Sequence, residues 1–312
     1  MSLTTLDRIA TYVPARSVPV EQVAAELGMS RYAGRVFRKF HGLDRLHQDP
    51  QSTVCDLVVP PAAELLRQTP DPSTIRYLLF AHTIPDVAPS ALNVAEEVAA
   101  RLGLTGVEAF AVTQQNCASG LAAIDIAGEL LRADGVPGAQ ALVVTGEKAF
   151  TPVTRFIAET TIMGEGAAAC LVGIDGPSNR VRSYVARTQG RFAHGIRLTP
   201  VQLRDFNESY ARDLTAVITE TVERAGLRLS DLDMVVPHNV NRLLWTRIIA
   251  ELGLDQDRIF LDTIARYSHC WCSDPLLNLA ALADDGRLIK GGRYLLTSVG
   301  LGSTYAAMVI EH

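Results

Sequence analysis

Short apolar segments alternate with helical segments along most of this chain, and that alternation constrains the fold more than any other feature. In the first half, the apolar segments have the length and composition of β-strands, and the strand at 109–112 is expected to be buried. The expected strands are 77–81, 109–112, 140–145 and 167–173, and the expected helices are 91–102 and 117–131. This order is typical of an α/β protein.

The second half repeats the same rhythm. It is expected to contain helices at 206–225, 241–252 and 275–284, a short strand near 259–261, and longer strands at 234–237, 293–299 and 305–310. No low-complexity segment or long linker separates the halves, so we expect one two-lobed body with halves at 1–173 and 174–312. Cys117 and His238 each lie between an apolar strand and a helix, which suggests a duplicated unit whose two turns face one shared site.

Cys117 begins the expected helix 117–131 within the sequence Gln-Asn-Cys-Ala-Ser-Gly. A cysteine in the first turn of a helix faces unpaired backbone N–H groups and the positive end of the helix dipole. Both favour the thiolate, which is the nucleophilic form. The alternative is a small buried cysteine that packs like an alanine.

Two histidines distinguish between these interpretations. His238 follows a strand that ends in Pro237, and His269 lies just before the helix expected at 275–284. Ligands of α/β proteins are usually bound at the ends of strands. A single histidine in such a place is more often structural, but two histidines and a helix-opening cysteine at such turns favour a site in which imidazole activates a thiol or carries protons.

Composition excludes several classes of protein. The 312 residues carry a formal net charge of −5 and no block of Lys and Arg, which gives no reason to expect nucleic-acid binding. No apolar run is long enough to span a membrane, and the first 18 residues do not resemble a secretory leader. The cysteines are odd in number and scattered, at positions 55, 117, 170, 270 and 272, which is untypical of a disulfide framework. We therefore expect a cytoplasmic protein.

Five motifs in order resemble those of one family. They are Thr-Ile-Pro-Asp with Pro-Ser at 83–90, Asn-Cys-Ala-Ser-Gly at 116–120, Met-Gly-Glu-Gly-Ala-Ala at 163–168, Val-Pro-His-Asn-Val-Asn at 236–241, and the glycine-rich turn at 298–305. Over nearly its whole length the chain resembles the ketosynthase III family of the thiolase superfamily. The resemblance implies a thiolase fold, in which two pseudo-repeated βαβαβ halves form a five-layered αβαβα body.

The resemblance also implies roles for particular residues. Cys117 would accept an acyl group from a thioester of coenzyme A or of an acyl carrier protein, and His238 and His269 would complete the catalytic set. The backbone N–H groups of Cys117 and Leu301 would hold the developing oxyanion. The substrate pocket would include Asn116, Ala88, Trp271, Asn241, Gly300 and Gly302. The resemblance further implies a homodimer and no cofactor beyond the acyl thioester substrate.

The chain also departs from the family pattern. His269 stands where the family usually has asparagine, and an imidazole can accept a proton that an amide cannot. The segment 173–206 is short, and Ala88 replaces a bulky residue, so we expect a roomier pocket. Residues 35–42 do not reproduce the pattern of tryptophan and arginine that typical members place on the coenzyme adenine, and Arg242 is one position from an expected arginine. The donor therefore stays open between coenzyme A and a carrier protein.

These departures favour transfer of the acyl group to a hydroxyl, an amine or a carrier thiol, in specialised-metabolite biosynthesis. One alternative is decarboxylative Claisen condensation of the acyl-enzyme with a malonyl thioester. Another is a non-catalytic partner subunit with the thiolase fold, although a scaffold would not need the cysteine, both histidines and the glycine-rich turn. The sequence His-Cys-Trp-Cys at 269–272 invites a metal site, but no second pair of ligands accompanies it, and we expect none.

Overall fold

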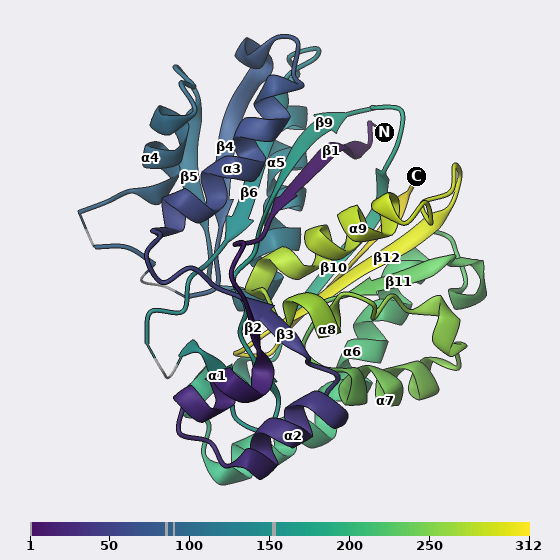
Figure 1. Cartoon of the computed structure of the whole chain (residues 1–312). Helices are drawn as coiled ribbons and strands as arrows, with labels where there is room; N and C mark the ends of the chain where they lie inside the picture. The colour runs from purple at the N-terminus through teal and green to yellow at the C-terminus, as the bar shows by residue number, and fades with distance from the viewer. Residues whose placement is uncertain (1, 85–86, 90, 152–153) are drawn as a thin grey trace.

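The first half of the chain forms a five-stranded part of the sheet in the order β5-β4-β6-β9-β1. The computed structural model describes residues 2–84, 87–89, 91–151 and 154–312 (Figure 1). The first-half elements are β1 (Thr4–Tyr12), α3 (Val54–Arg67), β4 (Ile75–Ala81), α4 (Val94–Arg101), β5 (Glu108–Val112), α5 (Ser119–Asp134), β6 (Gln140–Gly146) and β9 (Ala167–Ile174). Strands β5, β4 and β6 are parallel, whereas β9 is antiparallel to both of its neighbours, β6 and β1.

The second half has the same order of strands, β11-β12-β13-β10. Its elements are β10 (Arg180–Thr188), α6 (Pro200–Arg224), β11 (Met234–Pro237), α7 (Arg242–Leu252), α9 (Asp274–Asp284), β12 (Arg293–Gly300) and β13 (Thr304–Glu311). The prediction of a short strand near 259–261 is wrong, because a single parallel bridge, between Val235 and Ile259, forms there. The chain then turns into the short helix α8 (Ile264–Tyr267) before a ladder can develop. With that bridge in the place of the missing strand, both halves follow one topology.

The packing confirms the expected thiolase fold with five layers. One buried cluster contains residues of α5 and α9 together with strands of both halves, so these two helices lie between the sheets. A second cluster places α3 and α4 on the outer face of the first half, and a third places α6 and α7 on the outer face of the second. The layers therefore run α, β, α, β, α. The two half-sheets also meet at one pair, Thr5 with Arg180, which joins them into a single nine-stranded sheet.

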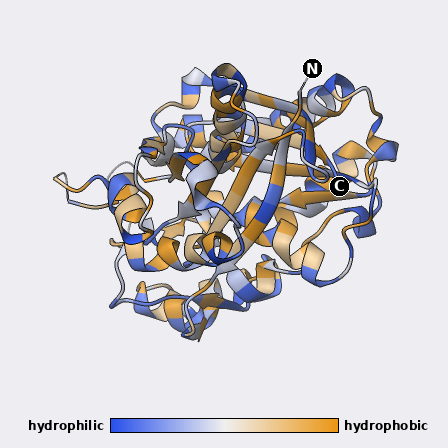
Figure 2. Cartoon of the chain, turned by 90° about the horizontal axis from the view of Figure 1, so that it is seen from above, coloured by the Kyte–Doolittle hydropathy of each residue, from blue (hydrophilic) through white to orange (hydrophobic). Residues whose placement is uncertain are grey.

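Burial explains why the central strands read as continuous apolar runs. Helices cover both faces of β6 and β9, so almost every residue of these strands is buried. Figure 2 shows hydrophobic colouring along much of the central strands. The expectation of a buried strand at 109–112 needs correction. β5 is the edge strand of the sheet, and four of its five residues are exposed or half-buried. An edge strand lacks one neighbour, which an apolar sequence cannot reveal.

The remaining elements surround this body. Below it in Figure 1 lies a small unit of β2 (Ser17–Pro19), α1 (Val20–Glu26), α2 (Arg31–Lys39) and β3 (Arg45–His47), which packs against the second-half core. The two-residue strands β7 (Phe156–Ile157) and β8 (Thr161–Ile162) form a hairpin. Within the described residues, no helix is both long and apolar enough to cross a membrane.

Candidate active site

Cys117 lies in a tight turn between β5 and α5. The turn is a 3₁₀ segment over Asn116–Ala118, so the cysteine precedes the α-helix instead of opening it as expected. Asn116 adopts a left-handed backbone conformation with φ of 49°, which is uncommon for a residue with a side chain. The Cys117 side chain is buried, and Ser298 on β12 donates a hydrogen bond of 2.7 Å to its backbone oxygen. The second half therefore holds the turn of the first half that carries Cys117.

The glycine-rich turn between β12 and β13 packs against the same segment. A Cβ atom on Gly300 would lie 2.0 Å from the backbone oxygen of Gln115, so only glycine fits this close approach. The Asn116 amide donates a hydrogen bond to the backbone oxygen of Leu301, and Gly302 lies next to that amide. The structure thus brings four of the predicted pocket and oxyanion residues together beside Cys117. Their contacts to substrate stay a prediction.

His269 lies directly beside Cys117. Its Nε2 atom is 3.3 Å from the Cys117 sulfur, across 152 residues of sequence. The segment that carries it is fixed to the β8 region, because Gly164 donates a backbone hydrogen bond of 2.9 Å to the His269 oxygen and the Ser268 hydroxyl donates to the Ile162 oxygen. The predicted thiol–imidazole pair is therefore within contact distance.

Asp274 is a site residue that the sequence interpretation missed. Its carboxylate is hydrogen-bonded to Nδ1 of His269 and accepts backbone N–H groups of Cys270, at 2.7 Å, and of Asn239, at 2.6 Å. The residue is fully buried at the first position of α9, where the helix dipole favours a negative charge. Cys117, His269 and Asp274 thus form a row of thiol, imidazole and carboxylate, an arrangement typical of an activated nucleophile. An aspartate at a helix start, five residues after the histidine, was the available signal.

The row determines the protonation state of His269. Burial by itself would lower the pKa of this imidazole, but the negative charges of Asp274 and Cys117 outweigh it and raise the pKa to about 10. His269 is therefore an imidazolium at neutral pH, next to the sulfur.

His238 is in the opposite state. Burial lowers its pKa to about 3, and the positive charge of His269 contributes, since the two ring centroids are 5.8 Å apart. Its Nε2 atom is 3.3 Å from the Tyr210 hydroxyl, and no hydrogen-bond partner of its Nδ1 atom is found among the described residues. One neutral and one charged imidazole therefore lie side by side in this site.

Comparisons with known proteins find similar chains of one family. The family described as 3-oxoacyl-[acyl-carrier-protein (ACP)] synthase III C terminal matches residues 222–312. The chain is 27% identical over 256 residues to the β-ketoacyl-[acyl-carrier-protein] synthase III of Laribacter hongkongensis, covering 77% of this chain and 78% of that protein. It is 25% identical over 289 residues to the enzyme of the same name from Lactobacillus delbrueckii subsp. bulgaricus, covering 86% and 88%. These matches support the ketosynthase III family of the thiolase superfamily as the family that this chain resembles.

Solved structures show the same fold. The synthase III of Pseudomonas aeruginosa PAO1 superimposes with a TM-score of 0.81 at 21% identity, covering 99% of this chain and 98% of that one. ChlB3, described as an acyltransferase, gives a TM-score of 0.85 at 21% identity and coverages of 99% and 97%. OleA of Xanthomonas campestris, solved with lauric acid and lauroyl-CoA, gives 0.84 at 18% identity and 99% of both chains. The same fold therefore occurs in proteins with different names.

The other predicted pocket residues, Trp271, Asn241 and Ala88, lie in different surroundings. Trp271 is buried with its ring centroid 6.5 Å from that of His269. Asn241 caps α7 by accepting the Leu244 N–H at 2.7 Å, and its amide donates to the Thr160 oxygen at 3.0 Å. Ala88 packs against the outer cluster of α3 and α4. The other residues of its predicted loop at 85, 86 and 90 lie outside the described residues.

A second carboxylate near the site, Glu147, also escaped the sequence interpretation. It follows β6, is fully buried, and accepts the backbone N–H groups of Thr83, at 2.9 Å, and of Ile84. Burial raises its pKa to about 8. Glu147 thus anchors the start of the loop that contains Ala88. Among the described residues, no group of three or more His, Cys, Asp and Glu side chains is arranged to hold a metal ion.

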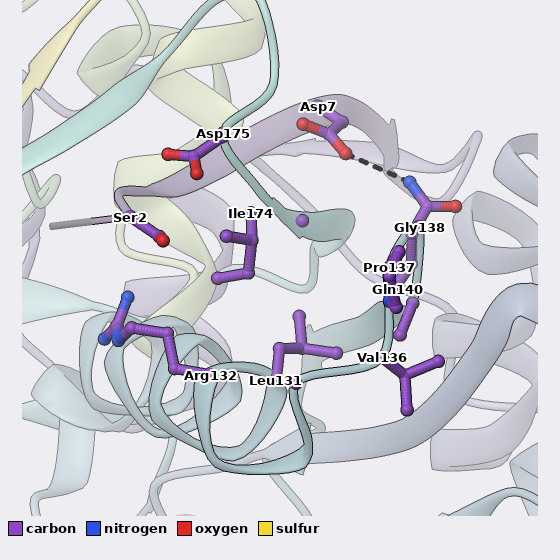
Figure 3. Close-up of a pocket in the computed structure, with 13 residues that line it drawn as sticks. Ser2, Asp7, Leu131, Arg132, Val136, Pro137, Gly138, Gln140, Ile174 and Asp175 are labelled. Carbon is purple, nitrogen blue, oxygen red and sulfur yellow. Dashed lines mark hydrogen bonds between the residues drawn. The ribbon is translucent and has the colours of Figure 1, made fainter.

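A cavity of about 410 Å³ lies at the opposite end of α5 from Cys117 (Figure 3). Asp7, Arg132, Gln140 and Asp175 contribute its polar groups, and Gln140 donates a hydrogen bond of 3.0 Å to Asp7. The sixteen residues of α5 separate this cavity from Cys117, a length of about 24 Å at 1.5 Å per residue. It therefore belongs to a different part of the molecule from the Cys117 site.

Proposed function

We propose that this chain is an acyltransferase. Cys117 accepts an acyl group from a coenzyme A or carrier-protein thioester and passes it to a hydroxyl, amine or carrier thiol, in specialised-metabolite biosynthesis. The observation that carries the proposal is the buried row of Cys117, His269 and Asp274, with 3.3 Å between the sulfur and Nε2. Such a row can move one proton back and forth beside a nucleophile.

Each half-reaction balances with these three residues. The Cys117 thiolate attacks the thioester carbonyl, its new C–S bond replaces the C–S bond of the donor, and the His269 imidazolium protonates the departing thiolate. The neutral His269 then takes the proton of the acceptor, whose oxygen, nitrogen or sulfur attacks the acyl carbonyl and displaces the Cys117 thiolate. Asp274 stabilises the imidazolium in the resting and final states.

The state of the two histidines supports transfer over condensation. By the family resemblance, a histidine and an asparagine hold the malonyl thioester oxygen during condensation, whereas His269 stands in the asparagine position and contacts Asp274 and Cys117. A base with an orienting carboxylate is suited to an acceptor that must lose a proton. The description of the structural neighbour ChlB3 as an acyltransferase also supports this interpretation.

We further propose that the protein is a homodimer. β5 is an edge strand whose Ala109 and Phe110 are only half-buried. An apolar edge strand without a neighbour is a template for pairing with a second copy. The cysteines are free and buried, which fits the cytoplasm as the expected compartment.

The experiment that tests the function is a single-turnover assay of His269→Asn. Cys117 is first loaded from a panel of acyl thioesters and the adduct is measured by intact-mass spectrometry. The loaded protein then receives either a malonyl thioester or a hydroxyl or amine acceptor. If His269 serves the acceptor, the variant loses about a hundredfold to ten-thousandfold in transfer. The asparagine variant restores the usual residue of the family, so efficient carbon–carbon product without loss against wild type would contradict the proposal. Absence of any wild-type adduct would favour a non-catalytic partner subunit.

A further inference from the structure

A buried ion pair joins the end of β6 to the segment before β9. The ammonium group of Lys148 lies 2.8 Å from Oε2 of Glu165, and the two side chains are only 5% and 12% exposed. Taking two charges out of water is costly, so a buried pair of this kind is weak evidence of stabilisation by itself. The contacts of both residues indicate a different purpose.

Each side chain of the pair also contacts the segment between β3 and α3. The Lys148 ammonium donates to the backbone oxygen of Asp49, at 2.6 Å, and to the Ser52 hydroxyl, at 3.0 Å. Oε2 of Glu165 accepts the backbone N–H of Asp49 at 2.8 Å. An ammonium group has three donors, and all three are used here. The pair is therefore fixed at the junction of three segments of the chain.

The segment that contains Glu165 also holds the backbone of His269. Gly164, the residue before Glu165, donates a backbone hydrogen bond of 2.9 Å to the His269 oxygen. Met163 and His269 form a parallel β-bridge. A Cβ atom on Gly164 would collide with the backbone oxygen of Tyr267, so only glycine allows the two segments to approach this closely. A displacement of Glu165 is therefore passed on to His269 through one residue.

The position of the His269 ring relative to Cys117 depends on such links between the halves. Nε2 of the ring is 3.3 Å from the Cys117 sulfur, which belongs to the first half. Asp274 orients the ring through Nδ1, but it lies only five residues further along the same segment, so it cannot fix the ring against the first half. The ion pair and the residues next to it belong to the first half, as Cys117 does. The pair therefore ties the segment that carries the imidazole to the half that carries the thiol.

We propose that Lys148 and Glu165 are positioning residues whose ion pair sets the distance between the His269 imidazole and the Cys117 sulfur. The inference deepens the acyl-transfer proposal and rests on it for its kinetic consequence. Hydrogen bonds between charged groups are short and strong, so the pair opposes movement of either partner. It acts on His269 through the backbone of Gly164, and neither charged side chain exchanges a proton with the acyl group or its acceptor.

The direct test measures the pKa of His269, which reports its contact with Cys117 without any acyl transfer. Burial lowers this pKa, but Asp274 and Cys117 raise it to about 10 in wild type, so Cys117→Ala should lower it. In the neutral variant Lys148→Met/Glu165→Gln, the pKa of His269 should shift toward that of Cys117→Ala, and adding Cys117→Ala to it should change little. ¹⁵N-histidine spectra recorded against pH give these values, and loss of signals in His269→Asn assigns the residue. A wild-type pKa in the neutral variant overturns the proposal.

The kinetic test uses the same variants in the single-turnover assay. A misplacement of about 1 Å can cost about a hundredfold in rate, so transfer from loaded Cys117 should slow by about that factor in the neutral variant. Lys148→Met and Glu165→Gln should each slow it by a similar factor, because either change breaks the same contact. The matched control is Arg76→Met, which breaks the 2.7 Å ion pair with Asp134 at the opposite end of α5 from Cys117. This control should transfer at the wild-type rate.

Three kinetic results would contradict the proposal. Equal slowing in Arg76→Met would attribute the effect to a general loss of stability. A wild-type rate in the neutral variant would mean that only an unpaired buried charge is harmful. Slowing in the neutral variant by the product of the two single effects would mean that Lys148 and Glu165 act independently.

The two tests also separate this proposal from the acyl-transfer proposal. If the wild-type protein transfers to no acceptor, acyl transfer fails, yet the pKa of His269 still decides the role of the ion pair. If transfer is found but the neutral variant matches wild type in rate and pKa, only the positioning role fails. Thermal unfolding of each variant reports whether it is folded. The neutral variant should fold even where a single variant does not, because replacing both members of a buried pair is tolerated better than removing one.

Discussion

The two halves of the molecule use one turn in two ways. In the first half, a 3₁₀ turn with Cys117 at its centre precedes α5, and in the second a 3₁₀ turn with Cys272 at its centre (Trp271–Ser273) precedes α9. The residue before each cysteine has a positive φ, 49° at Asn116 and 58° at Trp271. Yet the Cys117 sulfur faces His269 at 3.3 Å, whereas the Cys272 thiol donates to the backbone oxygen of Ala81 at 3.2 Å. The same local geometry thus places one thiol beside an imidazole and the other against a backbone oxygen.

The histidines make the same contrast. His82 follows β4 and His238 follows β11, the second strand of each half. The Nδ1 atom of His82 is 2.7 Å from the backbone oxygen of Ile84, and the ring stacks on Phe80, with centroids 5.0 Å apart. Nδ1 of His238 has no such partner among the described residues. The comparison teaches that chemistry in this fold depends on which partners the opposite half supplies.

The largest expected effect comes from the two cysteines. Cys117→Ala should abolish the acyl adduct and remain folded, because alanine is smaller and apolar and fits a buried turn. Cys272→Ala should keep the adduct, since burial raises the pKa of its thiol well above the usual value and leaves it unreactive. Intact-mass spectrometry after exposure to acyl thioesters measures both. An adduct on Cys117→Ala would show that a residue other than Cys117 accepts the acyl group.

The next effect concerns Asp274. Asp274→Asn keeps the size of the side chain but removes the charge that raises the pKa of His269, so transfer should slow by about a hundredfold to ten-thousandfold. Stopped-flow or quench-flow assays of acyl release from loaded Cys117 measure it. Asp284→Asn, at the other end of α9, is the matched control for an aspartate on the same helix. A wild-type rate in Asp274→Asn would show that the carboxylate only stabilises the start of α9.

The paired histidines give a comparable but smaller effect. His238→Asn should slow transfer by about a hundredfold to a thousandfold, the usual loss when one donor to a developing charge is removed. His82→Asn should leave the rate near wild type, because its ring nitrogen is occupied by the Ile84 oxygen. The same single-turnover assay applies to both variants. Equal losses in the two would mean that both histidines serve only to stabilise their loops.

The smallest effect is on stability against pH. On folding, the pKa of His238 falls from 6.5 to about 3, so the folded state binds fewer protons than the unfolded state. The contribution of His238 to the free energy of unfolding is therefore present above pH 6.5 and is lost as the pH falls toward 3. His269, with a pKa raised to about 10, contributes stability below pH 6.5 that is lost as the pH rises toward 10. Urea unfolding measures the free energy of unfolding of wild type and His238→Asn between pH 4 and 9. Below pH 6.5 this free energy should fall less steeply with decreasing pH in the variant than in wild type. If the free energy of unfolding fell equally steeply below pH 6.5 in both proteins, His238 would not be buried as a neutral ring.

Much of the fold could be predicted from the sequence because its signals are local. Strand β6 was expected at 140–145 and forms over Gln140–Gly146, since a continuous apolar run covered on both faces is visible in composition alone. Elements without such a signal were missed, including α3, in which Pro60 and Pro61 interrupt the helical pattern, and β10, whose residues are mostly half-buried or exposed. The edge position of β5 could not be predicted, because it depends on the absence of a neighbouring strand and not on the residues of β5 itself.

The sequence by itself determined the α/β repeat and the residue types available at its turns, namely Cys117, His238 and His269. Those features depend on neighbours within a few positions along the chain. Only the tertiary structure decided that Asp274 would orient His269, that Tyr210 would meet His238, and that Cys272 would not share the role of Cys117. The physical reason is that protonation state and reactivity depend on burial and on charges and donors within a few ångströms, and for Cys117 and His269 those come from residues 152 positions apart.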